Sequence, residues 1–416
     1  MGAGGGGERT IAADNQTRRQ LVTVATFDRA PKLPTSLDPH TTIVAAVELS
    51  KKTWLVAGHV PGLERRPLTR TDDHANGLLR ILTAWRKRGE QAGRTIARIV
   101  VAFEAGRDGF WLARWLQRHG IEAYVIHPSS IPVPRGARAK TDRLDTGMLL
   151  RAFSAWLRGE ADACRMVAIP SREQEDLRRP SRERAELVAE RTRLRNRIRS
   201  LLTLHGLNHV NPNTPATRRN LAQLRTAEDE LLPPNARTEL ERLFERLELV
   251  KKQIKVIEAS FLHPTHERTP GVGECSLAAA ARRSLRQLAK VTGLGATTAA
   301  TLVAEVFTRN FADRRALARF VGLTGTPDES GSRRRDRGLM KAGSARVRHV
   351  MIQLAWRMLY HQPNAALVQW YRDRVAKANN AGRKTFIVAL ARKLLIALWH
   401  FVQTGEVPEG MQLVAA

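Results

Sequence analysis

The chain has 416 residues, of which 43% are hydrophobic, so it is long enough for two or three globular domains. Its 69 Lys and Arg residues exceed 40 Asp and Glu residues, which gives a formal net charge of +29. Such an excess opposes compaction unless an anion compensates it, and nucleic acid is the commonest large anion. Cys164 and Cys275 lie far apart without other ligands at metal-binding spacing, which excludes a disulfide framework and a zinc site and fits a reducing cytoplasm.

Two features argue against a membrane partner or export. The longest apolar run, 385–402, contains Arg392 and Lys393, so we predict a buried helix there rather than a membrane span. The first ten residues, MGAGGGGERT, lack the basic and then apolar layout of a signal peptide.

The N-terminal part alternates strand and helix patterns. Residues 1–40 are Gly-rich, then polar and interrupted by proline, which predicts a disordered arm. A domain at 41–165 follows, and its pattern indicates a mixed sheet with helices on its faces. Short runs rich in β-forming residues predict strands at 42–49, 53–59, 65–70, 97–103 and 122–126.

Helical patterns dominate the rest of the chain. We predict a coiled-coil arm or dimerisation element at 166–265, where Pro180 should start or kink the first long helix. A linker at 266–284 leads to a mainly helical domain at 285–410, interrupted by a Gly-, Ser- and Arg-rich loop at 322–344. The heptad seam of the arm's second helix comprises Leu240, Leu243, Leu247, Val250, Ile254, Ile257 and Phe261.

Four carboxylates are candidates for a metal site. Glu48 and Glu104 end two predicted strands, and Asp142 and Asp145 share one face where a helix opens. Clustered carboxylates repel one another unless cations neutralise them, so the group indicates Mg²⁺ or Mn²⁺ and phosphoryl transfer. The alternative is structural, with Glu104 and Asp142 as helix caps and Asp145 as a surface charge. Residue spacing alone does not decide between them.

The glycines Gly293 and Gly295 stand between two helical segments. They suit a helix-hairpin-helix, in which backbone amides face a phosphate. An ordinary turn between core helices is the alternative, and a lone Gly-x-Gly favours it.

Ser330 lies among arginines in the predicted loop. A serine there could attack a phosphodiester while guanidinium groups stabilise the developing charge. The alternative is a solvated basic loop that only grips phosphates, which the composition by itself favours. Basic residues predicted to contact nucleic acid are Lys140, Arg333, Arg334, Arg335, Lys341 and Arg346.

A further basic stretch lies in the first long helix. Its arginines spread around the helix and are either a nucleic-acid contact, which the net charge favours, or solvated charge. They are Arg191, Arg193, Arg195, Arg197 and Arg199.

These motifs together resemble the DEDD transposases, the insertion-sequence family numbered one hundred and ten, which are described as bridge-RNA-guided recombinases. The resemblance covers about 41–410, and the pair KTDRLD and ESG…KAG is specific. The matching stretches are VELSK, FEAGRDGFW, His127 to Asp145, GLGATTAATLVAEV, FVGLTGTPDESGSRRRDRGLMKAGSARVRH and ALARKLLIALWHFVQTGEVPEG.

The resemblance implies a RuvC-like N-terminal domain with an RNase H fold, whose four acidic positions match Glu48, Glu104, Asp142 and Asp145. It also implies that Ser330 is the nucleophile of a C-terminal transposase domain, in a composite site built with another subunit. The resemblance further implies a homo-oligomer, a dimer or tetramer, that is held together partly by the coiled coil. It also implies a noncoding guide RNA that selects donor and target DNA. The chain departs from the family by Glu rather than Asp at position 48.

Three functions therefore stand side by side. The first is an insertion-sequence transposase that cuts and rejoins DNA in the cytoplasm, at the nucleoid. The second is a junction-resolvase-like nuclease that uses metal and water and does not need Ser330. The third is a non-catalytic nucleic-acid-binding scaffold.

Overall fold

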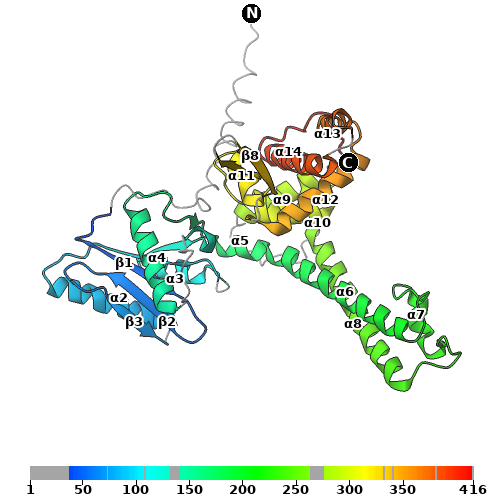
Figure 1. Ribbon diagram of the computed structural model, residues 1–416, viewed down its shortest axis with the longest axis horizontal. Helices are drawn as coiled ribbons and strands as arrows, with labels where there is room; N and C mark the ends of the chain where they lie inside the picture. The colour runs from blue at the N-terminus through cyan, green and yellow to red at the C-terminus, as the bar shows by residue number, and fades with distance from the viewer. Residues whose placement is uncertain are drawn as a thin grey trace, which may run out of the picture. The chain divides into compact units, whose positions relative to one another are not determined.

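A computed structural model describes residues 37–72, 74–106, 109–131, 141–262, 276–330, 333–339, 342–379 and 382–414. Most of the predicted N-terminal arm, together with Lys140 and Lys341, lies outside these residues. The chain divides into two compact units, Met1–Ser171 and Arg172–Ala416 (Figure 1).

The N-terminal unit is built on a six-stranded mixed sheet in the order β3-β2-β1-β4-β5-β6. The neighbours β1, β4 and β5 run parallel, whereas β2, β3 and β6 pair antiparallel. The mixed sheet agrees with the sequence-based prediction and is compatible with an RNase H-like fold. Its strands are β1 (Thr42–Glu48), β2 (Trp54–His59), β3 (Leu68–Thr71), β4 (Arg98–Glu104), β5 (Glu122–Ile126) and β6 (Met166–Val167).

Helices cover both faces of this sheet. Side chains alternate along β1, so that Val47 packs with α2 (His74–Gln91) and α3 (Trp111–Arg118). Ala46 faces the other way, into a second core formed with α4 (Asp142–Leu157). The alternation explains why β1 is buried along nearly its whole length. A short turn, η2 (Pro128–Ser130), follows β5.

The C-terminal unit begins with a pair of long helices, α6 (Arg179–Leu204) and α8 (Pro234–Leu262), which lie side by side (Figure 1). Pro180 lies in the first turn of α6, where a missing N–H removes no helical hydrogen bond, so the prediction that it starts the helix is confirmed. The heptad seam of α8 is filled by α6 of the same chain. Seam residues buried in this shared core include Leu240, Leu247, Val250 and Ile254.

Shorter elements complete the helix pair and the remaining helical region. Residues 276–284, predicted as part of a linker, form the start of α9 instead, because Leu285 and Leu288 anchor that helix in the core. The other elements are α5 (Arg172–Leu177), α7 (Pro215–Arg219), η3 (Leu221–Gln223), α9 (Ser276–Ala289), α10 (Ala296–Leu302), η4 (Val303–Phe307), α11 (Arg314–Val321), α12 (Ala345–His361), α13 (Ala366–Lys377) and α14 (Arg383–Thr404).

Among the described residues, α14 is the one helix that is long and apolar enough to cross a membrane by length and composition. Its residues Leu390, Leu394 and Leu398 are buried in the core of the helical region. The helix therefore has the placement predicted for 385–402, inside the protein.

The loop predicted at 322–344 contains a β-hairpin. Strand β7 (Gly325–Ser330) pairs antiparallel with β8 (Arg333–Leu339), and Ser330 is opposite Arg333. The register also places Glu329 opposite Arg334. A Gly-Ser dipeptide between two strand-length runs is a hairpin signal, which the reading as a loop overlooked.

Candidate active site

Glu48 and Glu104 lie together at one end of the N-terminal sheet. They end β1 and β4, which run parallel and pair Val47 with Phe103 immediately before the two glutamates. By strand alternation both continue the row of Ala46 and Ala102, on the face that α4 covers. Two half-buried carboxylates thus occupy neighbouring positions on one face.

The direction of α4 brings its first turn towards the same end of the sheet. Arg158, just after α4, lies close enough to His59 for its charge to act on that imidazole. Burial lowers the pKa of His59, and the positive charges of Arg66 and Arg158 lower it further. Since His59 pairs with Val44, near the opposite end of β1 from Glu48, α4 ends far from the glutamates. A helix of this length spans about 24 Å, similar to β1, so its first turn lies near them.

Asp142 and Asp145 occupy that first turn and the sheet-facing side of α4. Each precedes a fully or nearly fully buried residue by four positions, Thr146 and Leu149 respectively, so helical periodicity places both on that side, although Asp142 is exposed and Asp145 half-buried. Thr141 is the N-cap, and its hydroxyl accepts a hydrogen bond from the amide of Leu144 at 3.3 Å. Asp142 is therefore not the cap of this helix.

Glu104 does not cap a helix either, because α3 begins seven residues later with Phe110 as its N-cap. The alternative interpretation, in which Glu104 and Asp142 are helix caps, is therefore wrong. Glu104 instead ends β4, and Asp142 lies in the first turn of α4, the helix that covers the same face of the sheet.

The donor set suits a divalent cation, since carboxylate oxygens are the ligands that hard cations prefer. Side-chain positions, however, do not close around a common point. Within the described ranges, no three His, Cys, Asp or Glu side chains form a group that could hold a metal ion. The structure thus places Glu48 and Glu104 side by side at the ends of β1 and β4, and it does not gather the four carboxylates into a ligand sphere within the described ranges.

An exposed tryptophan near this end of the sheet was not among the predicted site residues. Trp111, the first residue of α3, is 42% exposed and lies 6.2 Å, centroid to centroid, from Trp54 at the start of β2. Trp54 directly precedes Leu55, which pairs with Glu48. An exposed indole is a surface on which a nucleic-acid base can stack. The signal for it was present, because Trp111 ends the FEAGRDGFW motif.

In the C-terminal unit, the structure places Ser330 at the end of a strand rather than in an irregular loop. Arg333, Arg334 and Arg335 begin the partner strand β8. The backbone register therefore keeps the serine and three basic residues at the same end of one hairpin.

The two glycines before α10 differ in their requirements. Gly293 has a φ of +83°, and a Cβ there would lie 2.6 Å from the Cβ of His361 on α12. Only glycine fits this position, because of both conformation and packing. Gly295 has an ordinary φ of −67° as the N-cap of α10, and a Cβ there would meet nothing within 4 Å. Helix-hairpin-helix binding of phosphate stays a prediction.

Arg346 has a structural contact. Its guanidinium donates to the carbonyl oxygen of Ser181 on α6 at 3.2 Å. It also adds positive charge near Glu305 of η4, to which Arg182 donates two hydrogen bonds of 2.7 and 3.0 Å. Burial raises the pKa of Glu305, but the hydrogen bonds from Arg182 and the charges of Arg182, Arg178 and Arg346 outweigh it, so the pKa is lowered overall. This cluster attaches α6 to the helical core.

Comparison with known proteins matches both parts of the chain. A family model of DEDD transposases, described as "Transposase", matches residues 66–206, and the model "Transposase IS116/IS110/IS902 family" matches 285–369. The Sinorhizobium fredii protein named "Putative transposase y4rJ" is 40% identical over 88% of this chain and 93% of its own length. The Coxiella burnetii "Transposase for insertion sequence element IS1111A" is 25% identical over 74% of this chain and 78% of its own. The chain therefore belongs to the IS116/IS110/IS902 family of transposases and is a DNA transposase of an insertion sequence.

Proposed function

We propose that this transposase cuts and rejoins DNA by two phosphodiester transesterifications, with Ser330 as the nucleophile. Glu48, Glu104, Asp142 and Asp145 are the residues that would hold Mg²⁺ or Mn²⁺. The proposal is supported by the neighbouring positions of Glu48 and Glu104 at the ends of β1 and β4, on the face that α4 covers, and by the two aspartates in the first turn of α4. A divalent cation bound there would polarise the scissile phosphate.

The chain's own groups would perform the covalent step. The Ser330 hydroxyl loses its proton as its oxygen attacks phosphorus, the bond between phosphorus and the leaving oxygen breaks, and that oxygen takes up a proton. The product is a phosphoserine ester, which a DNA hydroxyl resolves in the reverse sense. Guanidinium groups of the arginines that begin β8 would stabilise negative charge on the phosphoryl oxygens.

Partners beyond DNA belong to the same proposal. We propose a noncoding guide RNA and a homo-oligomer, dimer or tetramer, working in the cytoplasm at the nucleoid. Because the seam of α8 packs against α6 of the same chain, an oligomer contact along the arm would use the outer surface of the helix pair rather than the seam.

The test is a search for a protein–DNA adduct. Purified protein, the flanking RNA of its element and labelled donor and target DNA would be incubated with Mg²⁺ and separated on a denaturing gel. We expect an adduct with the wild type that is lost in Ser330→Ala and in Asp142→Asn. Matched controls are Ser332→Ala and Asp162→Asn, which should keep it.

Two other results would favour the other functions. If DNA is cleaved without an adduct, and Ser330→Ala still cleaves it, the protein is a nuclease that uses water and the serine mechanism is wrong. Tight, salt-sensitive binding with no cleavage by any form would indicate a scaffold.

A further inference from the structure

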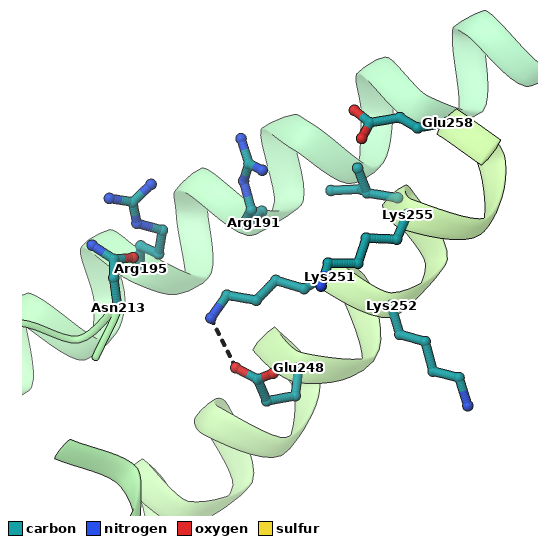
Figure 2. A pocket seen from close by; sticks show the side chains of 9 residues that line it. Arg191, Arg195, Asn213, Glu248, Lys251, Lys252, Lys255 and Glu258 are labelled. Carbon is teal, nitrogen blue, oxygen red and sulfur yellow. Dashed lines mark hydrogen bonds and ion pairs between the residues drawn. The ribbon is translucent and has the colours of Figure 1, made fainter. Parts of the chain in front are cut away.

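The helix pair carries a basic hollow of about 530 Å³ between α6 and α8, shown in Figure 2. Two arginines on α6 lie one turn apart, and three lysines occupy two successive turns of α8, so cations line both walls. The residues of this arm groove are Arg191, Arg195, Asn213, Glu248, Lys251, Lys252, Ile254, Lys255 and Glu258.

The two carboxylates of the arm groove are already engaged. Glu248 accepts a hydrogen bond from Lys251 at 2.8 Å, and Glu258 pairs at 2.6 Å with Arg184, which lies outside the groove. In the part of the chain that the structure describes, no ion pair neutralises the other four cations. These are Arg191, Arg195, Lys252 and Lys255.

A buried polar atom also lacks a partner at this place. The Nε atom of Arg191 is inaccessible to solvent and makes no hydrogen bond with the described residues. Leaving a buried donor without a hydrogen bond is unfavourable. The positive charge of the guanidinium is delocalised over its other nitrogens, so an anion seated in the arm groove would still be attracted to Arg191.

The basic surface continues towards the tip of the helix pair. A second hollow of about 420 Å³ shares Asn213, Glu248 and Lys251 with the first and adds Arg218 and Arg219 of α7. Glu248 and Glu258 are ten positions apart on α8, or about 15 Å along its axis. At roughly 3.4 Å per phosphate along one strand, that length matches about four phosphates. A linear polyanion therefore fits better than a single small anion.

We infer that the arm groove binds the phosphodiester backbone of a nucleic acid. This contact lies on elements other than those bearing the carboxylates and Ser330, and it does not depend on the proposed serine chemistry. Apart from Ile254 and the two engaged carboxylates, the groove is lined by cationic side chains and one amide, which suit phosphates rather than base edges. Binding there should be strong, salt-sensitive and indifferent to sequence. The same chemistry is offered by duplex DNA and by a folded RNA stem.

The test compares two triple variants of the full chain with equal charge change. The groove variant is Arg195→Gln, Lys252→Gln, Lys255→Gln, which spares the half-buried Arg191. The control variant is Arg193→Gln, Arg199→Gln, Arg242→Gln, which removes three exposed cations of the same two helices that do not line the groove. Affinity for a labelled DNA duplex, and for the RNA duplex of the same sequence, is measured across a salt series, and circular dichroism checks that both variants fold.

We expect the groove variant to bind at least one duplex about tenfold or more weakly, with a salt slope smaller by about 2 to 3. The control variant should change affinity less than about threefold. A loss confined to the RNA duplex assigns the groove to RNA, and a loss confined to DNA assigns it to DNA. Equal effects of the two variants, or none, would overturn the inference. The Ser330→Ala variant should bind both duplexes with wild-type affinity. The binding assay therefore tests the groove alone, and the adduct assay tests the serine mechanism.

Discussion

The start and the middle of helix α6 use the same residue type in opposite ways. Near its start, Arg182 is held by two hydrogen bonds to the buried Glu305. About two and a half to three and a half turns later, Arg191 and Arg195 line the arm groove, where no described carboxylate pairs with them. A cation beside a buried carboxylate is satisfied within the chain, whereas a cation on an open groove keeps its charge for a ligand.

A run of arginines on a helix can therefore stabilise the fold at some positions and face a ligand at others. The prediction treated the arginines at 191–199 as one group, either a contact or solvated charge. In the structure they divide, because Arg197 pairs with Glu239 at 2.9 Å, Arg191 and Arg195 face the groove, and Arg193 and Arg199 do neither. The net charge therefore indicates that the partner is a nucleic acid. Which arginines are left without an ion pair indicates the surface that binds it.

The largest effect is expected when the apolar core that holds α6 against α8, and so shapes the arm groove, is weakened. Phe244 is 2% exposed in the core between α6 and α8. Phe244→Ala should lower the free energy of unfolding by about 3–5 kcal/mol, because it leaves a cavity. Urea denaturation measures this, with Phe244→Leu as the milder control. A loss below about 1 kcal/mol would show that the helix pair does not depend on this core.

The second test addresses the cluster at the start of α6. The Glu305 side chain is 7% exposed and that of Arg182 is 50% exposed. Glu305→Gln should cost about 2–3 kcal/mol, less than for a fully buried pair because water still reaches Arg182. Chemical denaturation checks it. Nucleic-acid affinity should stay at the wild-type level, so a large loss of binding would contradict the division between structural and ligand-facing arginines.

A pH titration sharpens the same point. Because the pKa of Glu305 is lowered in the folded protein, its stabilisation is present above its ordinary pKa of 4.5 and is lost as pH falls through the depressed value. The difference in unfolding free energy between wild type and Glu305→Gln should be full at neutral pH and shrink below pH 4.5. A difference that stays constant down to strongly acidic pH would rule out the carboxylate as its cause.

The smallest effect belongs to the exposed pair on the same helix. Arg197 and Glu239 have side chains 60% and 37% exposed. Glu239→Gln should change the unfolding free energy by about 0.5 kcal/mol or less, since surface ion pairs are screened by water and salt. Thermal unfolding at low and high salt measures it. An effect comparable to that of Glu305→Gln would remove the distinction between buried and exposed pairs on α6.

Local patterns in the sequence were sufficient for several features. Alternating and continuous apolar runs predicted five of the six strands of the mixed sheet, all but the two-residue β6, and Pro180 marked the start of α6, because both signals depend on neighbours in sequence. The hairpin at β7 and β8 was missed, since its charged strands lack apolar alternation and only the Gly-Ser dipeptide indicated a turn. The linker prediction failed at 276–284 because packing against the helical core extends α9 there.

The candidate site shows the same limit. Motif spacing selected Glu48, Glu104, Asp142 and Asp145, but not which face of the sheet they share, which depends on strand register and on the direction of α4. The FEAGRDGFW motif contained Trp111 but did not show that its side chain is exposed, which follows from its position at the start of α3.

By itself, the sequence determined the class of partner through net charge, the division into sheet and helices through periodicity, and the family through its motifs. Tertiary structure alone decided that the heptad seam is filled by α6, that Glu305 engages Arg182, and that Arg191 and Arg195 face an open groove. The reason is that periodicity shows which residues share a face, whereas the neighbour that covers this face, or leaves it open, is set by contacts between residues distant in sequence.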